Sequence, residues 1–232
     1  MDVLGDKVVT GSSDHGLREY KMGSMTQIRQ LYNKRFGHSE WVTSVSYALD
    51  GRILSGGMDA KLCSWDKRVV RCDDLTGHKG SVSKVLVDNS GVGMSASYDG
   101  SILIWDLKTK ECLQGLFRGH KDAVTTFEWR NSLMVSGARD GSLAFWDINV
   151  GKTFKKSRGH EGAVSKMKFF DDGQDTSIII TAGLNDGVVC VHDMRTNKII
   201  SSEQVHKGAI NMLETSPSNM IVTGSGDKTM KQ

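Results

Sequence analysis

The stretch Gly77–Asp106, GHKGSVSKVLVDNSGVGMSASYDGSILIWD, decides the fold, because its opening Gly-His and closing Trp-Asp recur along the chain. The same dipeptides bound Gly37–Asp66 and Gly119–Asp147, and a further copy, Gly159–Asp193, has His192 in place of the tryptophan. Successive repeat histidines are separated by 40, 42, 40 and 46 residues: His38, His78, His120, His160 and His206. The chain is therefore built from repeats of roughly 40–45 residues.

Each repeat has the pattern of four short β-strands. In the repeat that starts at His38, residues 41–47 alternate apolar and polar side chains, which is the period of a strand. Residues 52–57, 61–65 and 69–75 supply the next three strands. One such sheet leaves apolar surface exposed on both faces, so neighbouring sheets must stack to bury it.

With this period and these dipeptides, the chain resembles the WD-repeat family. The resemblance implies an all-β fold, a β-propeller of four-stranded antiparallel blades, in a single domain over residues 1–232. We expect an incomplete ring from a parent of six or seven blades, with residues 1–37 as a partial first blade of three strands and residues 206–232 as a truncated last blade. The repeats between them have the length of a blade: 38–77, 78–119, 120–159 and 160–205.

Four polar side chains recur at fixed places in three repeats. In the family that the chain resembles, the corresponding residues form a hydrogen-bonded chain of indole, hydroxyl, imidazole and carboxylate inside each blade, which satisfies polar groups that are buried there. The residues are His38, Ser55, Asp59 and Trp65; His78, Ser95, Asp99 and Trp105; and His120, Ser136, Asp140 and Trp146. In the repeat after His160, one extra residue separates Thr181 from Asp186, which argues against the full network there.

The same serine, histidine and aspartate could in principle serve a hydrolase. The trio recurs in three repeats, however, and the chain has no G-x-S-x-G nucleophile elbow. We therefore predict a structural role for these residues and no enzymatic activity.

The composition bears on whether the chain binds nucleic acid or a membrane. The 30 basic and 27 acidic residues leave a net charge of +3, so neither nucleic acid nor an anionic membrane is indicated as a partner. The amino terminus has no apolar signal segment and no run of 18 apolar residues follows, which predicts no membrane insertion. We expect a cytoplasmic protein, with nuclear or cytoskeletal association as the alternatives.

The four cysteines, Cys63, Cys72, Cys112 and Cys190, form no C-x-x-C pair and read as reduced thiols, with a disulfide or metal role as the alternative. Cys190 and His192 share one face of a strand and could suggest a metal ligand pair. We nevertheless predict no metal site and no cofactor.

The resemblance also implies where protein partners bind. Family partner contacts concentrate on one face, at the residue before the first-strand valine and the residue before the turn aspartate. These positions are Trp41, Ser81, Ala123, Ala163 and Ala209, with Ser13, Met58, Tyr98, Arg139, Asn185 and Gly226. We select Trp41, Met58, Tyr98 and Arg139, because tryptophan, tyrosine and arginine are enriched in binding hot spots and methionine adapts to varied partners. The alternative is a scatter of ordinary surface residues.

The predicted function is a non-enzymatic scaffold or adaptor that joins other proteins in a multiprotein complex. One alternative, a substrate receptor of a ubiquitin ligase, is based on the segment Trp65-Asp66-Lys67-Arg68. The segment His192-Asp193-Met194-Arg195 has a similar pattern. These resemble the motif by which some WD-repeat proteins dock the adaptor of cullin-4 ubiquitin ligases, with Arg68 and Arg195 as the docking residues. A structural subunit of a cytoskeletal or ciliary assembly is the other alternative.

Overall fold

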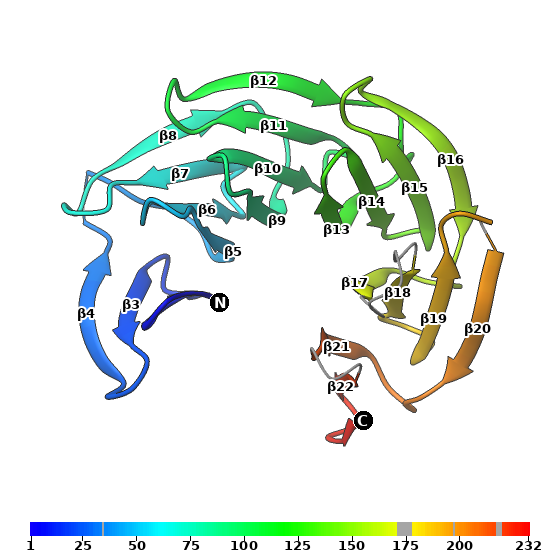
Figure 1. Ribbon diagram of the computed structural model, residues 1–232. Helices are drawn as coiled ribbons and strands as arrows, with labels where there is room; N and C mark the ends of the chain where they lie inside the picture. The colour runs from blue at the N-terminus through cyan, green and yellow to red at the C-terminus, as the bar shows by residue number, and fades with distance from the viewer. Residues whose placement is uncertain (34, 171–177, 197, 217–219) are drawn as a thin grey trace. The chain divides into compact units, whose positions relative to one another are not determined.

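The computed structural model contains strands, turns and bends throughout the described part of the chain, as the sequence predicts (Figure 1). The described residues are the following: 1–33, 35–170, 178–196, 198–216 and 220–232. The chain divides into two compact units, residues 1–118 and 119–232, and each is described by itself. No helix in the described ranges is long and apolar enough to cross a membrane.

The first unit holds three four-stranded antiparallel sheets, each formed by four strands that follow one another in the chain. Their bounds are β1 Asp2–Leu4, β2 Lys7–Gly11, β3 Leu17–Lys21 and β4 Thr26–Leu31; β5 Val42–Tyr47, β6 Ile53–Gly57, β7 Lys61–Trp65 and β8 Cys72–Thr76; and β9 Val82–Val87, β10 Val92–Ser97, β11 Ile102–Asp106 and β12 Glu111–Leu116.

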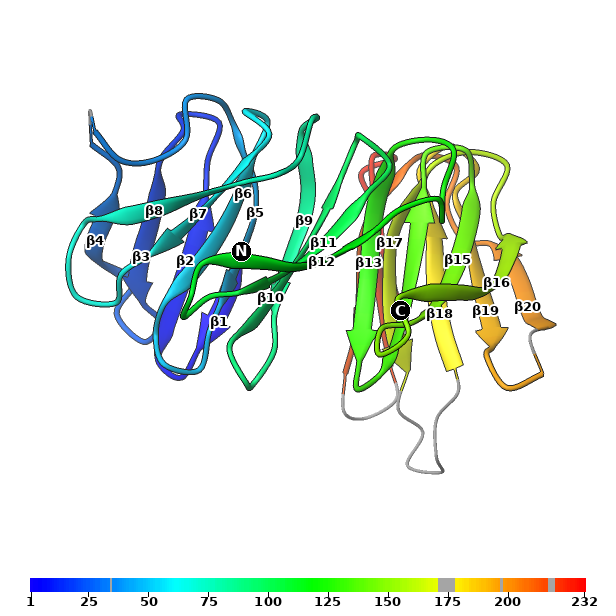
Figure 2. The ribbon, with the colours of Figure 1, turned by 90° about the horizontal axis from the view of Figure 1, so that it is seen from above.

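The second unit holds two four-stranded sheets and one three-stranded sheet with the same sequential order, and Figure 2 shows the antiparallel strands from a second direction. Their bounds are β13 Val124–Arg130, β14 Leu133–Ala138, β15 Ser142–Asp147 and β16 Lys152–Arg158; β17 Val164–Phe170, β18 Ile178–Gly183, β19 Val188–Asp193 and β20 Lys198–Gln204; and β21 Ile210–Thr215, β22 Ile221–Ser225 and β23 Met230–Lys231. The predicted blade architecture of sequential antiparallel strands is confirmed.

Residues 1–37 differ from the prediction of three strands. They form four, because β1 pairs with β2 in antiparallel register. With only three residues, β1 is too short to display an alternating pattern in the sequence. It is also tied to the next sheet, since the Asp2 carboxylate accepts hydrogen bonds from the Tyr47 N–H at 2.7 Å and the Ser46 hydroxyl at 3.2 Å.

The outer strand of the second sheet begins later than its sequence pattern suggests. We predicted a strand over residues 69–75, whereas β8 starts at Cys72. The Asp66 carboxylate accepts the backbone N–H groups of Arg68 at 2.7 Å and Val69 at 3.1 Å. This side-chain turn competes with strand pairing, and residues 66–71 form a loop instead.

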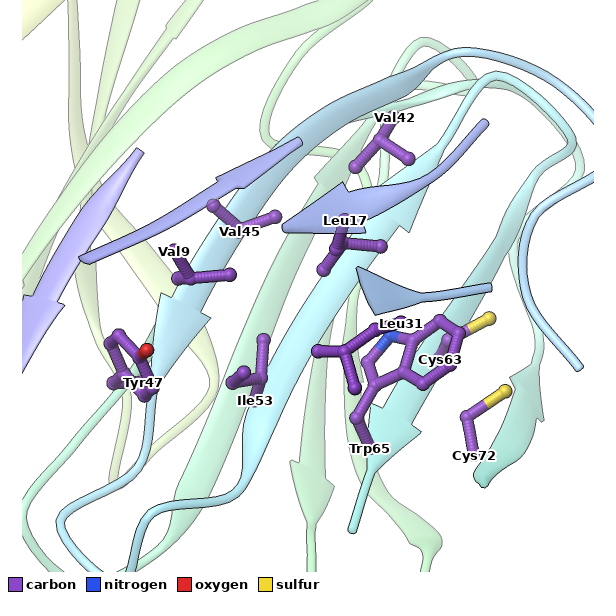
Figure 3. Close-up of a cluster of buried hydrophobic side chains, with 10 residues drawn as sticks. All are labelled: Val9, Leu17, Leu31, Val42, Val45, Tyr47, Ile53, Cys63, Trp65 and Cys72. Carbon is purple, nitrogen blue, oxygen red and sulfur yellow. The ribbon is translucent and has the colours of Figure 1, made fainter. Parts of the chain in front are cut away.

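The apolar core lies between neighbouring sheets of each unit. Figure 3 shows the cluster between the first two sheets: Val9, Leu17, Leu31, Val42, Val45, Tyr47, Ile53, Cys63, Trp65 and Cys72. Between the second and third sheets, Gly56 on β6 faces Val82 on β9, and a Cβ atom at Gly56 would lie 2.4 Å from the valine Cγ1. The sheets approach so closely at this point that only glycine fits.

Candidate functional site

A buried polar network runs through each repeat, and its geometry decides whether the Ser-His-Asp trio could be catalytic. In the repeat of His38, the Trp65 indole donates to Ser55 Oγ at 2.9 Å, and Ser55 Oγ lies 2.8 Å from His38 Nε2. His38 Nδ1 lies 3.0 Å from the Asp59 carboxylate. The repeat of His78 has the same contacts, with distances of 2.8, 2.7 and 3.2 Å. Because the serine hydroxyl is fully buried and already accepts the indole proton, the arrangement joins strands and presents no nucleophile to solvent.

The repeat of His120 departs from the predicted network at its carboxylate. Trp146 donates to Ser136 at 2.8 Å, and Ser136 lies 2.6 Å from His120 Nε2, as predicted. His120 Nδ1 instead lies 2.9 Å from Ser142 Oγ, and Asp140 accepts the backbone N–H of Ser142 at 2.9 Å. The hydroxyl of Ser142 therefore stands between the imidazole and Asp140.

Sequence reasoning missed a hydroxyl that follows the turn aspartate by two residues. Ser101 Oγ lies 3.1 Å from His78 Nδ1, and Thr229 Oγ1 lies 3.0 Å from His206 Nδ1. Ser142 takes the same position beside His120. The recurring Asp-x-Ser or Asp-x-Thr spacing is the signal that would have found them.

The repeat of His160 has the full network, which corrects the prediction made from its extra residue. His160 Nε2 lies 2.9 Å from Thr181 Oγ1, and Nδ1 lies 3.1 Å from Asp186. His192 occupies the place of the tryptophan, with its Nε2 at 3.0 Å from Thr181 Oγ1. The turn between β18 and β19 absorbs the additional residue, so the spacing change does not reach the network.

Burial lowers the pKa of four of the network imidazoles, His78, His120, His160 and His192, and so favours their neutral form. Loss of water lowers the pKa of His78, although the Asp99 carboxylate beside it acts in the opposite direction. The same desolvation lowers the pKa of His120 to about 4 and that of His192 to about 4. A neutral imidazole with its proton on Nδ1 can donate to the carboxylate while Nε2 accepts from the hydroxyl, which orients the whole chain of bonds.

Replacing the Trp105 indole tests the energetic value of this network. We expect Trp105→Phe to lower the free energy of unfolding by about 1–3 kcal/mol, because the buried Ser95 hydroxyl loses its donor while most apolar area is kept. Urea denaturation of the chain measures the loss. Trp129→Phe is the matched control, since Trp129 is only partly buried and its indole donates to the Asn131 carbonyl at an exposed turn. Equal losses in the two variants would contradict a special role for the network.

The predicted partner-binding residues of the first unit form one continuous row. The Met58 N–H donates to the Trp41 carbonyl at 2.9 Å, and the Tyr98 N–H donates to the Ser81 carbonyl at 2.9 Å. The Ser81 hydroxyl donates to the Met58 carbonyl at 3.1 Å and thereby joins the two pairs. Trp41 and Tyr98 are each 53% exposed and Met58 is 43% exposed, so three large side chains remain open to solvent along these turns.

Arg139 takes the corresponding position in the second unit. Its N–H donates to the Ala123 carbonyl at 2.9 Å, and its guanidinium lies 2.8 Å from the Asp122 carboxylate. In the next repeat, Leu184 rather than the predicted Asn185 makes the equivalent bond, to the Ala163 carbonyl at 2.7 Å. The extra residue in that turn shifts the position by one, and it places an exposed leucine where Met58 stands in the first unit.

Arg68 and Arg195 both lie in exposed turns after the third strand of their sheets. Their backbone N–H groups donate to Asp66 at 2.7 Å and Asp193 at 2.8 Å, respectively. Arg68 belongs to the first unit and Arg195 to the second. Their proposed docking role stays a prediction.

Comparison with known proteins agrees with this repeat geometry. Residues 29–66, 69–106 and 110–147 match the family model described as "WD domain, G-beta repeat". Over 156 residues the chain is 30% identical to a guanine nucleotide-binding protein subunit beta from Oryza sativa subsp. indica, an alignment that covers 59% of the chain and 41% of that protein.

Two further relatives carry other names. The chain is 29% identical over 148 residues to Pre-mRNA-processing factor 17 of Mus musculus. This alignment covers 60% of the chain and 25% of the relative. The chain is 30% identical over 179 residues to Autophagy-related protein 16 of Arabidopsis thaliana. This alignment covers 75% of the chain and 34% of the relative. The matched region spans less than half the length of each of these curated relatives.

Proposed function

Because the chain belongs to the WD-repeat family of β-propeller proteins, we propose that it acts as a non-enzymatic scaffold that brings other proteins together in a multiprotein complex. The observation that carries the proposal is the row of Trp41, Met58 and Tyr98 on hydrogen-bonded turns of the first unit. Large apolar and aromatic side chains held by rigid backbone at the ends of strands are suited to a protein partner, because little conformational entropy is lost when they are covered.

The buried network supports the non-enzymatic part of the proposal. Ser55 and Ser95 are each fully buried, and each already bonds both an indole and an imidazole. The same kind of network is repeated through successive sheets, which is the behaviour of a structural element. A cytoplasmic location is part of the same proposal, with nuclear or cytoskeletal association as the alternatives.

Alanine substitutions in the row test the proposed surface. We expect Trp41→Ala and Tyr98→Ala each to weaken partner binding by about 2 kcal/mol, or roughly 30-fold in Kd, because a central aromatic anchor loses desolvated contact area. Affinity purification with the native chain and mass spectrometry identifies the partner, and calorimetric titration measures its binding to each variant. Thermal melts of the variants exclude misfolding.

Phe154→Ala is the matched control for this experiment. Phe154 lies on the outer strand β16 and is 55% exposed, which is close to the 53% of Tyr98. We expect binding to be unchanged, and likewise in Lys155→Ala on the same strand. If the Phe154 and Lys155 variants lose affinity while the Trp41 and Tyr98 variants keep it, the binding surface is the outer strand and the proposal is wrong.

The ubiquitin-ligase receptor is the second candidate, favoured by the exposure of Arg68 and Arg195. It predicts a different partner surface, because Arg68 follows the third strand of its sheet, at the end opposite to the row. Arg68→Ala in the same titration distinguishes the two functions. Lost binding with Arg68→Ala and retained binding with Trp41→Ala would favour the ligase receptor.

A further inference from the structure

Cys63, Cys72 and Asp74 bring three metal-ligand atoms together at the outer side of the second sheet. In the register of β7 and β8, Cys63 pairs with Asp74 and Trp65 pairs with Cys72, so all four side chains leave the sheet on one face. The Asp74 Oδ1 atom lies 3.6 Å from the Cys63 sulfur and 3.7 Å from the Cys72 sulfur. All three atoms lie within 4.8 Å of one another, and Figure 3 shows the two thiols side by side.

These separations are the ones that a tetrahedral zinc ion requires. Zn–S bonds are about 2.3 Å long and Zn–O bonds about 2.0–2.2 Å, so tetrahedral geometry places a sulfur and an oxygen ligand about 3.5–3.7 Å apart. The two measured sulfur–oxygen distances, 3.6 and 3.7 Å, agree with that range. The backbone pairing of β7 and β8 thus holds three ligands close to their bound arrangement.

Lys61 orients the Asp74 carboxylate for metal binding. Its ammonium lies 2.7 Å from Asp74 Oδ2, while the other oxygen, Oδ1, faces the sulfurs. A ligand carboxylate that is hydrogen-bonded through its second oxygen is the usual outer-sphere arrangement in metal sites. Two thiolates, one carboxylate and Zn²⁺ carry a net charge of −1, which the ammonium balances.

We propose that Cys63, Cys72 and Asp74 bind one Zn²⁺ ion, with water as the fourth ligand. The mixed donor set favours zinc over Cu⁺, which selects thiolate and thioether ligands, and over Mg²⁺ or Ca²⁺, which select oxygen. Cys63 is fully buried, whereas the Asp74 side chain is 46% exposed and provides access for the ion and for water. The ion links β7 to the outer strand β8. The site has no C-x-x-C signature, because its cysteines come from two strands.

Titration of the reduced native chain with Co²⁺ tests the site directly. Tetrahedral Co²⁺ with thiolate ligands absorbs visible light, and we expect a single Co²⁺ per chain that Zn²⁺ displaces. Asp74→Asn keeps the shape of the side chain but removes the charge, and Cys72→Ser removes a sulfur. Each should weaken binding by more than about 100-fold, since the loss of an outer-sphere partner alone costs roughly 10–100-fold.

Two matched controls separate this cluster from other surface groups. Asp73→Asn removes the neighbouring, partly exposed carboxylate, which contacts Lys110 instead, and Cys112→Ser removes an exposed thiol. Both variants should bind Co²⁺ as the native chain does. Zn²⁺ should also raise the melting temperature of the native chain and of Asp73→Asn, but not that of Asp74→Asn. The proposal is overturned if no tetrahedral cobalt spectrum develops, or if Asp74→Asn and Cys72→Ser bind as tightly as the native chain.

Discussion

Gly141→Ala should destabilise the second unit by about 2–5 kcal/mol, the sum expected for a strained backbone torsion and an overpacked contact. Gly141 lies in the turn between β14 and β15 with φ at 81°. A Cβ atom there would lie 2.1 Å from the carbonyl oxygen of His160. The obstacle is backbone and cannot rotate away, because the Gly141 carbonyl itself accepts the Gly159 N–H at 3.1 Å and holds the next repeat against the turn.

Gly91→Ala is the control that separates the two costs. Gly91 has nearly the same torsion, with φ at 86°, but its nearest neighbour to a new Cβ atom is Arg52 Nη2 at 3.9 Å. Ala60 and Lys228 adopt φ values of 63° and 67° in turns equivalent to that of Gly141, so the left-handed conformation alone is tolerated. Urea denaturation should show a loss of about 1–2 kcal/mol for Gly91→Ala and a larger loss for Gly141→Ala. Equal losses would mean that contact between repeats at Gly141 costs little.

The repeat pattern predicted the sheets well because each recurring polar residue satisfies a hydrogen-bonding need of its buried neighbours. An indole, a hydroxyl and an imidazole that are buried together must bond one another, so Trp65, Ser55 and His38 predict both a buried site and its spacing. The strand patterns predicted β5, β6 and β7 to within one residue. β6 is buried along its whole length between two neighbouring sheets, so the turn residues on either side of it, rather than alternation, marked its bounds.

What the sequence did not predict depends on side-chain turns and on pairing between strands. The Asp66 turn sets where β8 starts, and it thereby places Cys72 diagonally across from Cys63. No local spacing between the two cysteines indicates that pairing. Leu184 illustrates the same limit, because one inserted residue moved the exposed position without disturbing the buried bonds of Thr181.

The second large effect concerns pH: lowering it from 7 to 5 should destabilise the second unit by roughly 4 kcal/mol through His120 and His192. Desolvation holds the pKa of each imidazole at about 4 in the folded chain, against 6.5 in the unfolded chain. The unfolded chain therefore binds protons that the folded chain does not. The stability that the neutral imidazoles contribute is fully present above the pKa of the unfolded chain. It is lost progressively as the pH falls from about 6.5 to about 4. Each histidine contributes about 2 kcal/mol of the loss between pH 7 and 5.

The network carboxylates contribute little to the change in stability between pH 7 and pH 5. Burial raises the pKa of Asp59 and Asp140, but hydrogen bonds from their neighbours outweigh it, and both values end below the ordinary 3.8. Such groups stay ionised in the folded and unfolded chains at pH 5, and the stability that they contribute is lost only at lower pH. A decline between pH 7 and 5 therefore reports on the histidines.

His192→Trp tests which imidazoles are responsible. The substitution restores the indole that other repeats carry at this position, so a donor for Thr181 Oγ1 is retained while one titrating group is removed. Urea denaturation at constant ionic strength should show a shallower pH dependence in this variant than in the native chain, because one imidazole with a lowered pKa is removed while His120 and His160 still titrate. Stability at pH 7 should be at least as high as that of the native chain. If native stability is flat from pH 7 to 5, or if His192→Trp declines as steeply as the native chain, these buried imidazoles do not control the pH response of the fold.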